Sequence, residues 1–363
     1  MLDFRLDEEQ QMLVEVINRF ATEKLRTVFR EAEESGEMPA DVLQAGWEIG
    51  ALPASIPGEY GGFGEHSAVT SAIATEEFSF GDLAITLQIM TPNLLAIPVM
   101  LAGTEAQKQA YLPSCVDTDI PKVTAALTER VYQFDPYNLG VTATANDDGY
   151  VLNGIKVYVP AAADAETILV WANEGGTTQG FLVATDTVGV TIGERDKLMG
   201  VQALATYEVR LDNVQISADA KLGGAEGCNF DLILNYSRVA LGAAAVGVAR
   251  ASYEYAREYA KEREQFGRPI AQNQSIAFML ADMASDVESA RLLVWEAAWL
   301  LDQGEDATQA TTVMKQYVDD VVLRVCDNGV LILGGYGFIR EYPAELWLRN
   351  ARGFASFDGL AIA

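Results

Sequence analysis

The sequence has one histidine and three cysteines among 363 residues, and this scarcity excludes several kinds of chemistry. The cysteines, Cys115, Cys228 and Cys326, are far apart and show no CxxC spacing, so the sequence predicts neither a disulfide framework nor a zinc site. A single histidine leaves almost no material for a Ser-His-Asp triad or a His-rich metal site. The protein must therefore rely on carboxylates or on a cofactor, and we expect no metal site.

The one histidine, His66, lies in the glycine-rich segment YGGFGEHSA. Its imidazole could act as a base, because an unperturbed histidine titrates close to neutral pH. A solvated loop residue explains this position more simply, and we favour that interpretation.

Basic residues are also scarce, since 25 Lys and Arg stand against 52 Asp and Glu, giving a formal charge of −27. This charge argues against nucleic acid or an anionic membrane as a partner, because both attract positive surfaces. No uninterrupted apolar run approaches the roughly 18 residues of a spanning helix; the longest candidate, 239–249, ends at Arg250. The first residues have neither a basic n-region nor an apolar h-region, so we expect a cytoplasmic protein without membrane insertion.

The apolar periodicity changes twice along the chain. After a plausible N-cap at Asp7, apolar residues recur at helical spacing up to Leu25, and further helical stretches follow to about residue 115. Between about 120 and 222, β-branched runs flank the turns NDDG and NEGGTTQ, which is typical of hairpins. Helical periodicity then returns, with apolar residues from Ile276 to Val294 spaced alternately by four and three. The pattern predicts an α+β protein with a helical domain at 1–118, a β domain at 119–222 and a helical bundle at 226–363.

Three segments carry features that this periodicity does not explain. REQFGRPIAQNQ, 263–274, combines an Arg fork suited to phosphate with a flexible glycine, although an ordinary loop between helices could look the same. LGGYGF, 333–338, could end a helix or expose backbone N–H groups to a ligand. Arg238 could recognise an anionic or carbonyl group, or could pair with one of the many acids.

These segments together, in their order, resemble the acyl-CoA dehydrogenases. The resemblance spans nearly the whole chain and rests on MLDFRLDEEQ, IPGEYGG, AALTE, NGIKVYV, KEREQFGRPIAQNQ, ILGGYGFIREYPAELWLRNAR and the closing DG. It implies an N-terminal helical domain, a central β domain and a C-terminal four-helix bundle. It also implies a tetramer, an acyl-CoA substrate, and FAD bound between the last two domains.

In this family a carboxylate near the C-terminus, typically Glu in an EG(T/S) turn, removes the α-proton of an acyl-CoA thioester while a hydride passes to flavin N5. The matching residues here are Asp358 and Gly359, followed by Leu360 in place of Thr. The resemblance therefore implies Asp358 as the base. Its neighbours in RGFASFDGLAIA are mainly apolar, and we expect them to raise its pKa.

Two flavin-binding motifs of the family are altered. The loop that resembles TEPGxGSD is TERVYQFD here, which keeps Thr128 as a cofactor contact but replaces the small residues with the bulk of 130–134. The motif WIT(N/S) is matched by 158–161, where Pro160 can offer neither an N–H nor a hydroxyl. We therefore expect this chain's own flavin site to be obstructed.

A third set of residues is retained. By resemblance, Arg238 lies beside the substrate, although its usual acidic companion is Asn235 here. The residues that reach across to the FAD of a neighbouring subunit are all present, namely Arg263, Phe266, Gln274, Gly334 and Gly335. This chain keeps the residues that contact the neighbour's FAD and loses the motifs that bind its own. That combination is typical of the non-flavin half of a heteromeric dehydrogenase with a homologous partner. The alternative is a self-sufficient FAD homotetramer that uses Asp358 on an acyl-CoA or another carbon acid.

Overall fold

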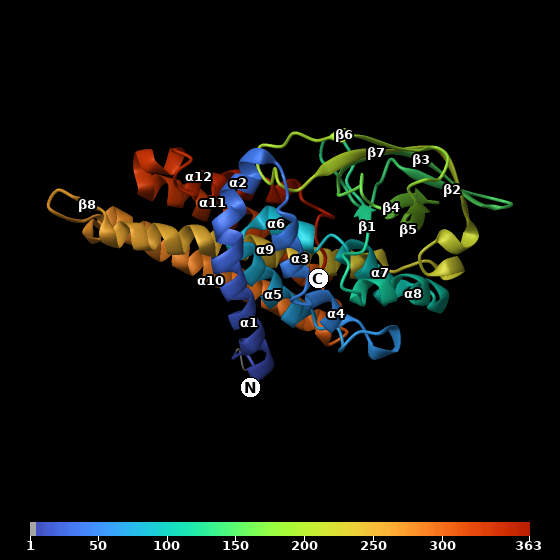
Figure 1. Ribbon diagram of the computed structural model, residues 1–363, viewed down its shortest axis with the longest axis horizontal. Coiled ribbons are helices and arrows are strands. Elements are labelled where there is room, and N and C mark those ends of the chain that lie inside the picture. Colours follow the sequence, from blue (N-terminus) through green and yellow to red (C-terminus); the bar gives the residue numbers. More distant parts are fainter. Residues whose placement is uncertain (1–4) are drawn as a thin grey trace.

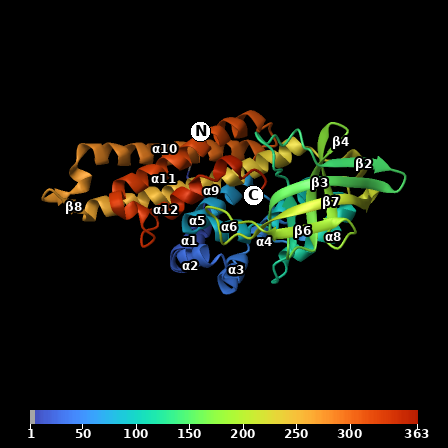
Figure 2. The same cartoon turned by 90° about the horizontal axis from the view of Figure 1, so that it is seen from above.

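A computed structural model describes residues 5–363 and shows a helical bundle at one end and a β domain at the other (Figure 1). The N-terminal helices pack against both, as the second view confirms (Figure 2). The α+β architecture predicted from the sequence, helical then β then helical, is confirmed.

The N-terminal helices begin where the sequence places a cap. Gln10 donates its backbone N–H to Asp7 Oδ1 at 2.8 Å, and the Gln10 side chain accepts the Asp7 N–H in return. This reciprocal pair satisfies two N–H groups that lack partners inside the helix. The helices of this domain are α1 Glu8–Phe20, α2 Arg26–Ser35, α3 Ala40–Trp47, α4 Ala51–Ser55, α5 Ala68–Gly81, α6 Leu83–Ile89, α7 Asn93–Ala102 and α8 Glu105–Tyr111.

The β domain is built on the two hairpins that the sequence predicts. Strands β2 and β3 close at the Asn146–Gly149 pair, and β4 and β5 close at Glu174–Thr177, where Gly175 and Gly176 both have positive φ. Such φ values suit the tight turns of hairpins. The strands are β1 Val123–Ala126, β2 Thr142–Asn146, β3 Gly149–Pro160, β4 Thr167–Glu174, β5 Thr177–Ala184, β6 Val190–Arg195 and β7 Thr206–Ser217, in the order β1-β4-β2-β3-β7-β6 with β5 on β4.

The bundle consists of long helices whose buried stripe follows the predicted spacing. On α10 the stripe is buried from Met283 to Val294, whereas its first members, Ile276 and Leu280, are only half-buried. A two-stranded hairpin joins α9 to α10 at the far end of the bundle (Figure 1). The elements are α9 Phe230–Glu262, β8 Glu264–Gln265, β9 Arg268–Pro269, α10 Gln274–Asp302, α11 Thr308–Leu333 and α12 Ala344–Ala351.

Two bundle helices are long and apolar enough to cross a membrane by length and composition alone. The most apolar window of α9 has a mean hydropathy of 1.5, and that of the segment Thr308–Phe338 has 1.3. These windows admit up to two charged residues, so α9 reaches this level although its longest uninterrupted apolar run is 239–249. In this fold, 89% of the α9 window and 50% of the other are buried inside the molecule. Packing against neighbouring helices thus accounts for the apolar character of α9.

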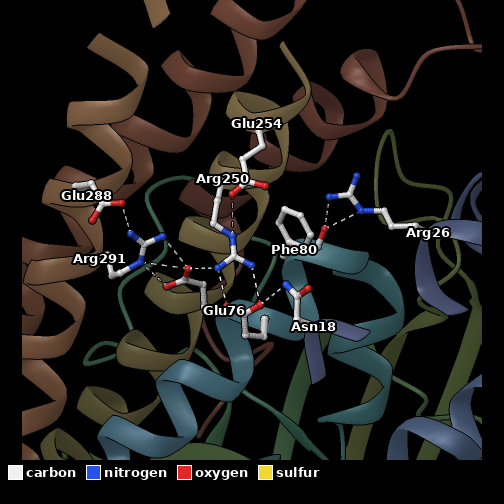
Figure 3. A network of polar contacts seen from close by, with 9 residues as sticks. Asn18, Arg26, Glu76, Phe80, Arg250, Glu254, Glu288 and Arg291 are labelled. Carbon is white, nitrogen blue, oxygen red and sulfur yellow. Dashed lines mark hydrogen bonds and ion pairs between the residues drawn. The ribbon is translucent and has the colours of Figure 1, made fainter. Parts of the chain in front are cut away.

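A buried ionic network joins α5 to the bundle (Figure 3). Arg250 on α9 donates to Glu76 at 2.7 Å and to Glu77 at 2.6 and 2.7 Å, and Arg291 on α10 donates to Glu76 at 2.9 Å. Asn18 of α1 donates to Glu77 at 2.8 Å. Because removing one member would leave a buried charge unpaired, the network fixes how the first domain sits on the bundle.

A second buried carboxyl, Asp82, caps α6 by accepting the N–H of Ile85 at 2.9 Å. Burial is the main cause that raises the pKa of Asp82 to about 7 from 3.8. The folded chain therefore binds this proton more tightly than the unfolded chain does. The stability that this proton contributes is fully present below about pH 4 and is lost as the pH rises through about 7.

We predict that Asp82→Asn, which keeps a capping oxygen but cannot ionise, removes this loss. Relative to the wild type, the variant should gain free energy of unfolding as the pH rises from about 4 to about 8, by up to about 4 kcal/mol. Urea denaturation at several pH values would measure this difference. The control is Thr104→Ala at the N-cap of α8, which removes a cap but no titratable group, so the difference should stay nearly constant. A flat difference for Asp82→Asn would contradict the prediction.

Candidate functional site

Asp358 lies where the β domain meets the bundle, close to Thr128 and Lys315. The Thr128 hydroxyl donates to the backbone carbonyl of Asp358 at 2.7 Å, so two sequence-predicted site residues are brought together. The Asp358 carboxylate is 3.7 Å from Lys315 Nζ on α11, which also binds Asp319 at 2.7 Å. The sequence predicts mainly apolar neighbours for Asp358, and it does not predict this cation beside the carboxylate. Sequence reasoning missed Lys315 because it lies 43 residues before Asp358 and only the packing of α11 brings them together.

Glu129, which follows Thr128, anchors the altered flavin loop at its base. Its carboxylate accepts the N–H groups of Gly140 and Val141 at 2.6 and 2.9 Å and pairs with Lys156 Nζ at 2.7 Å. Lys156 is fully buried and also donates to the carbonyl of Leu127 at 2.8 Å. Burial lowers the pKa of Lys156 to about 8, although the Glu129 carboxylate opposes that shift. The two ends of the loop are therefore held together by one buried carboxylate.

The loop itself does not fold inward as the sequence suggests. Tyr132 is 93% exposed and Val131 is 55% exposed, while Arg130 extends to Glu208 at 3.6 Å. Phe134 is half-buried and packs against the main core. The expectation that Tyr132 fills the flavin site is wrong for this structure, because its side chain points into solvent. Of the two aromatic substitutions, Phe134 is the one that occupies interior space.

Pro160, at the end of β3, lies between two strained residues. Tyr158 and Ala161 have φ of 56° and 51°, which non-glycine residues rarely adopt. Pro160 pairs with Thr206 of β7 in the sheet and has no N–H to donate. Pro160 therefore leaves this strained stretch of backbone without an N–H donor at its centre. Such strain persists only where the surrounding structure fixes it, and it clusters at functional sites.

The cavity next to Gly359, which follows Asp358, is small. Its volume is about 20 Å³, which is close to the space needed by one water molecule. Its walls come from α7, β1, β4, α9 and the segment after Asp358, with lining residues Leu94, Pro98, Ala125, Leu127, Trp171, Phe230, Ile233, Leu234, Ser237, Gly359, Ala361 and Ile362.

Arg238 follows Ser237 on α9 but makes its hydrogen bond elsewhere. Its guanidinium donates to Thr312 of α11 at 3.0 Å. Its neighbour Asn235 is buried and exchanges hydrogen bonds with Thr308 and Thr311 at 3.1 and 2.7 Å. These contacts join α9 to α11, so the structure gives Arg238 a partner within the bundle rather than at Asp358.

His66 is not the solvated loop residue that the sequence suggests. Both ring nitrogens are buried, and the ring lies 5.2 Å from that of Tyr236. Burial is the main cause that lowers the pKa of His66 to about 4, so the imidazole is uncharged at neutral pH. The glycine-rich segment around His66 suggests an exposed loop. The sequence does not show that α9, through Tyr236, packs against the ring.

The remaining site residues lie at the opposite end of the bundle, beside the β8–β9 hairpin (Figure 2). Arg263, Phe266 and Gly335 line a recess of about 630 Å³ there. Gln274 is the first residue of α10 and Gly334 follows α11, each next to residues that line the recess. The structure thus gathers this set at one place, far along the bundle from Asp358.

Two features of the recess have no explanation within the chain. Phe266 is 96% exposed, and its φ of 55° is that of the two-residue turn with Gly267 that closes the β8–β9 hairpin, so the position requires this backbone but not an aromatic side chain. Gly335 has no positive φ, and a Cβ there would meet no atom within 4 Å. Neither backbone conformation nor packing inside the chain therefore requires glycine at 335. The Arg263 guanidinium lies 5.4 Å from the Tyr336 ring, which orients it at the recess.

Comparison with known proteins identifies the family. The models of the acyl-CoA dehydrogenase N-terminal, middle and C-terminal domains match residues 7–119, 124–214 and 231–361. The chain is 34% identical to the caffeyl-CoA reductase–Etf complex subunit CarC of Acetobacterium woodii, over 97% of this chain and 95% of that protein.

Solved structures agree with this match. Butyryl-CoA dehydrogenase from Megasphaera elsdenii superposes with a TM-score of 0.89 at 31% identity, covering 99% of this chain and 96% of that one. A glutaryl-CoA dehydrogenase from Mycobacterium smegmatis in complex with FADH2 gives 0.88 at 26% identity, covering 98% and 92%. The chain belongs to the acyl-CoA dehydrogenase family. It is an oxidoreductase of that family, and the family's cofactor is FAD.

The buried Lys156–Glu129 pair should determine the stability of this region. We predict that Lys156→Met costs about 3–5 kcal/mol in free energy of unfolding, because it leaves the Glu129 carboxylate buried without a counter-charge. Adding Glu129→Gln to it should recover much of that loss. The control is Lys122→Met, which removes an ion pair whose side chains are 63% and 75% exposed and should cost at most about 1 kcal/mol. Equal losses for Lys156→Met and Lys122→Met in urea denaturation would contradict the prediction.

Proposed function

We propose that this chain is the subunit that completes the FAD site of a homologous acyl-CoA dehydrogenase subunit, within a heterotetramer that oxidises an acyl-CoA thioester at Cα and Cβ. The observation that carries the proposal is an asymmetry between two sites. The recess at the end of the bundle is open and formed, whereas the site beside Asp358 lacks donors and space.

The site beside Asp358 fits FAD poorly. The Thr128 hydroxyl already donates its hydrogen bond to the Asp358 carbonyl, and Pro160 has no N–H to donate. Phe134 is packed inward from a loop whose family counterpart is made of small residues. Because FAD fits poorly here, Asp358 of this chain has no hydride acceptor beside it in the proposed complex.

The recess fits one end of a dinucleotide that a neighbouring subunit binds. Arg263 offers a fixed fork of donors suited to a phosphate, and Gly335 leaves its backbone accessible. Phe266 is 96% exposed, and a partner that covers it would remove its aromatic ring from water. In this arrangement the FAD, held mainly by the partner, supplies the hydride acceptor, and the present chain contributes binding and orientation.

The alternative is a homotetramer in which each chain binds its own FAD and uses Asp358 as the base. One observation favours it, since Thr128 and Asp358 are still joined and the carboxylate is still present at the position of the base. The alternative requires Asp358 to exchange Lys315 for a substrate, because the two side chains now face each other at 3.7 Å.

Flavin stoichiometry separates the two. We predict that the purified chain alone carries almost no FAD, and that co-expression with a homologous acyl-CoA dehydrogenase subunit yields a yellow complex with one FAD for each pair of subunits. Flavin absorbance against protein concentration, with the subunit ratio from mass spectrometry, measures this. One FAD per chain in a homotetramer would overturn the proposal and establish the alternative.

The proposed contact between Arg263 and the FAD of the partner subunit can be tested in the same complex. Arg263→Ala in this chain should weaken FAD binding by about ten- to a hundredfold, because a charge-assisted hydrogen bond to phosphate is lost. The control is Arg257→Ala, which removes an exposed pair with Glu258 on the same helix and should leave FAD affinity unchanged. Gel filtration must show that both variants assemble; equal FAD affinity in the two assembled complexes would exclude Arg263 as a contact.

A further inference from the structure

The four residues after Gly359 run into the interior of the molecule. Leu360, Ala361, Ile362 and Ala363 are 5%, 0%, 2% and 2% exposed and belong to the main hydrophobic core. In both ribbon views the C label lies near the middle of the molecule, where the bundle, the first helices and the β domain meet (Figures 1 and 2). We refer to these residues as the 360–363 segment.

The turn at Gly359 directs the segment inward. Gly359 has a φ of 79°, and a Cβ there would lie 2.7 Å from the Cβ of Leu127. Only glycine fits this backbone conformation and this close approach to the strand segment at Leu127. The Leu360 N–H then closes the turn by donating to the carbonyl of Phe357 at 3.0 Å.

One side chain from the bundle and one from the first helices hold the segment in place. Ser237 of α9 donates to the carbonyl of Ala361 at 2.7 Å, and Asn93 at the start of α7 donates to the carbonyl of Ile362 at 3.2 Å. Buried backbone carbonyls need such partners, so the segment is docked by specific hydrogen bonds as well as by apolar contact.

The segment occupies space that a ligand would need. Ala361 and Ile362 line the cavity of about 20 Å³ next to Gly359, whereas Ala363 lines a separate cavity of about 650 Å³ enclosed mainly by α1, α4 and α5. Ligand sites commonly have volumes of about 300–1,000 Å³. The first cavity is therefore too small for any acyl group while the segment is present, and the last residue of the segment lies at the wall of a space that is large enough.

We propose that the 360–363 segment is the permanent occupant of this chain's acyl cavity, so that this subunit takes up no acyl-CoA and the acyl group is bound in the partner's cavity alone. This inference rests on the proposed function for the role of the partner. A covalently attached segment acts at an effective concentration of the order of millimolar, so a free acyl-CoA at micromolar concentration competes poorly with it.

The test is the number of acyl-CoA molecules that the complex binds. Butyryl-CoA is titrated by calorimetry into the FAD-containing complex with the partner, with CoA alone as the reference ligand. We expect one butyryl-CoA for each pair of subunits. Deleting residues 360–363 from this chain should raise that number to two. Two in the wild-type complex, or one in an assembled deletion complex, would overturn the inference.

A second variant covers the case in which the deletion does not assemble. Ser237→Ala combined with Asn93→Ala keeps every residue of the segment but removes both hydrogen bonds that dock it. We expect a second, weaker butyryl-CoA to bind to this variant, and its absence from the assembled complex would count against the inference. The control is Ile85→Ala, which truncates a fully buried side chain in a different core cluster and should leave the number at one.

Failure of this inference and failure of the proposed function give different results. If the chain proves to be a homotetramer with one FAD each, the proposed function fails, and the titration is then made on that homotetramer. No butyryl-CoA per chain would still support the segment as occupant, whereas one per chain would refute it. Flavin content therefore reports on the first proposal and acyl-CoA stoichiometry on the second.

Discussion

The docking of residues 358–362 is the constraint on which the rest of the architecture depends. The backbone of this short stretch is held by one side chain from each domain: Thr128 from the β domain, Ser237 from the bundle and Asn93 from the first helices. Each donor fixes a carbonyl of the same stretch, so the three domains cannot move apart without exposing buried polar groups. This stretch thus joins the three domains and includes Asp358 itself.

The two candidate sites have been shaped in opposite ways. Around Asp358 the structure gives up space and donors, since Pro160 replaces a hydrogen-bonding residue and the remaining cavity is about 20 Å³. Around Arg263 it keeps an open recess and leaves Phe266 exposed. An aromatic side chain with 96% exposure leaves apolar surface in water, which is one reason why we propose a partner subunit at this end. The family membership supplies the class of chemistry, and this asymmetry is the basis for the role proposed for the chain.

Sequence reasoning succeeded where the relevant signal was local. The Asp7 and Gln10 cap, the hairpin at Gly175 and Gly176, and the buried stripe of α10 all depend on residues within a few positions of one another. It failed where a distant element decided the environment. His66 is buried by α9, Lys315 reaches Asp358 from another helix, and Tyr132 points outward although its size suggested a filled site. The search for uninterrupted apolar runs did not single out α9 as a possible spanning helix, although its most apolar window has a mean hydropathy of 1.5. Many of the residues that α9 buries in the bundle are alanine and glycine.

The sequence by itself determined the order of the domains, the family and the positions of Asp358 and Arg263, because periodicity and motifs are properties of neighbouring residues. Only the tertiary structure decided that the residues after Gly359 turn inward, that two of them line a small cavity, and that Gly335 has no packing role. These facts depend on which side chains from separate domains meet at one point. Contact across domains is set by the packing of whole elements, and no local pattern of residues encodes it.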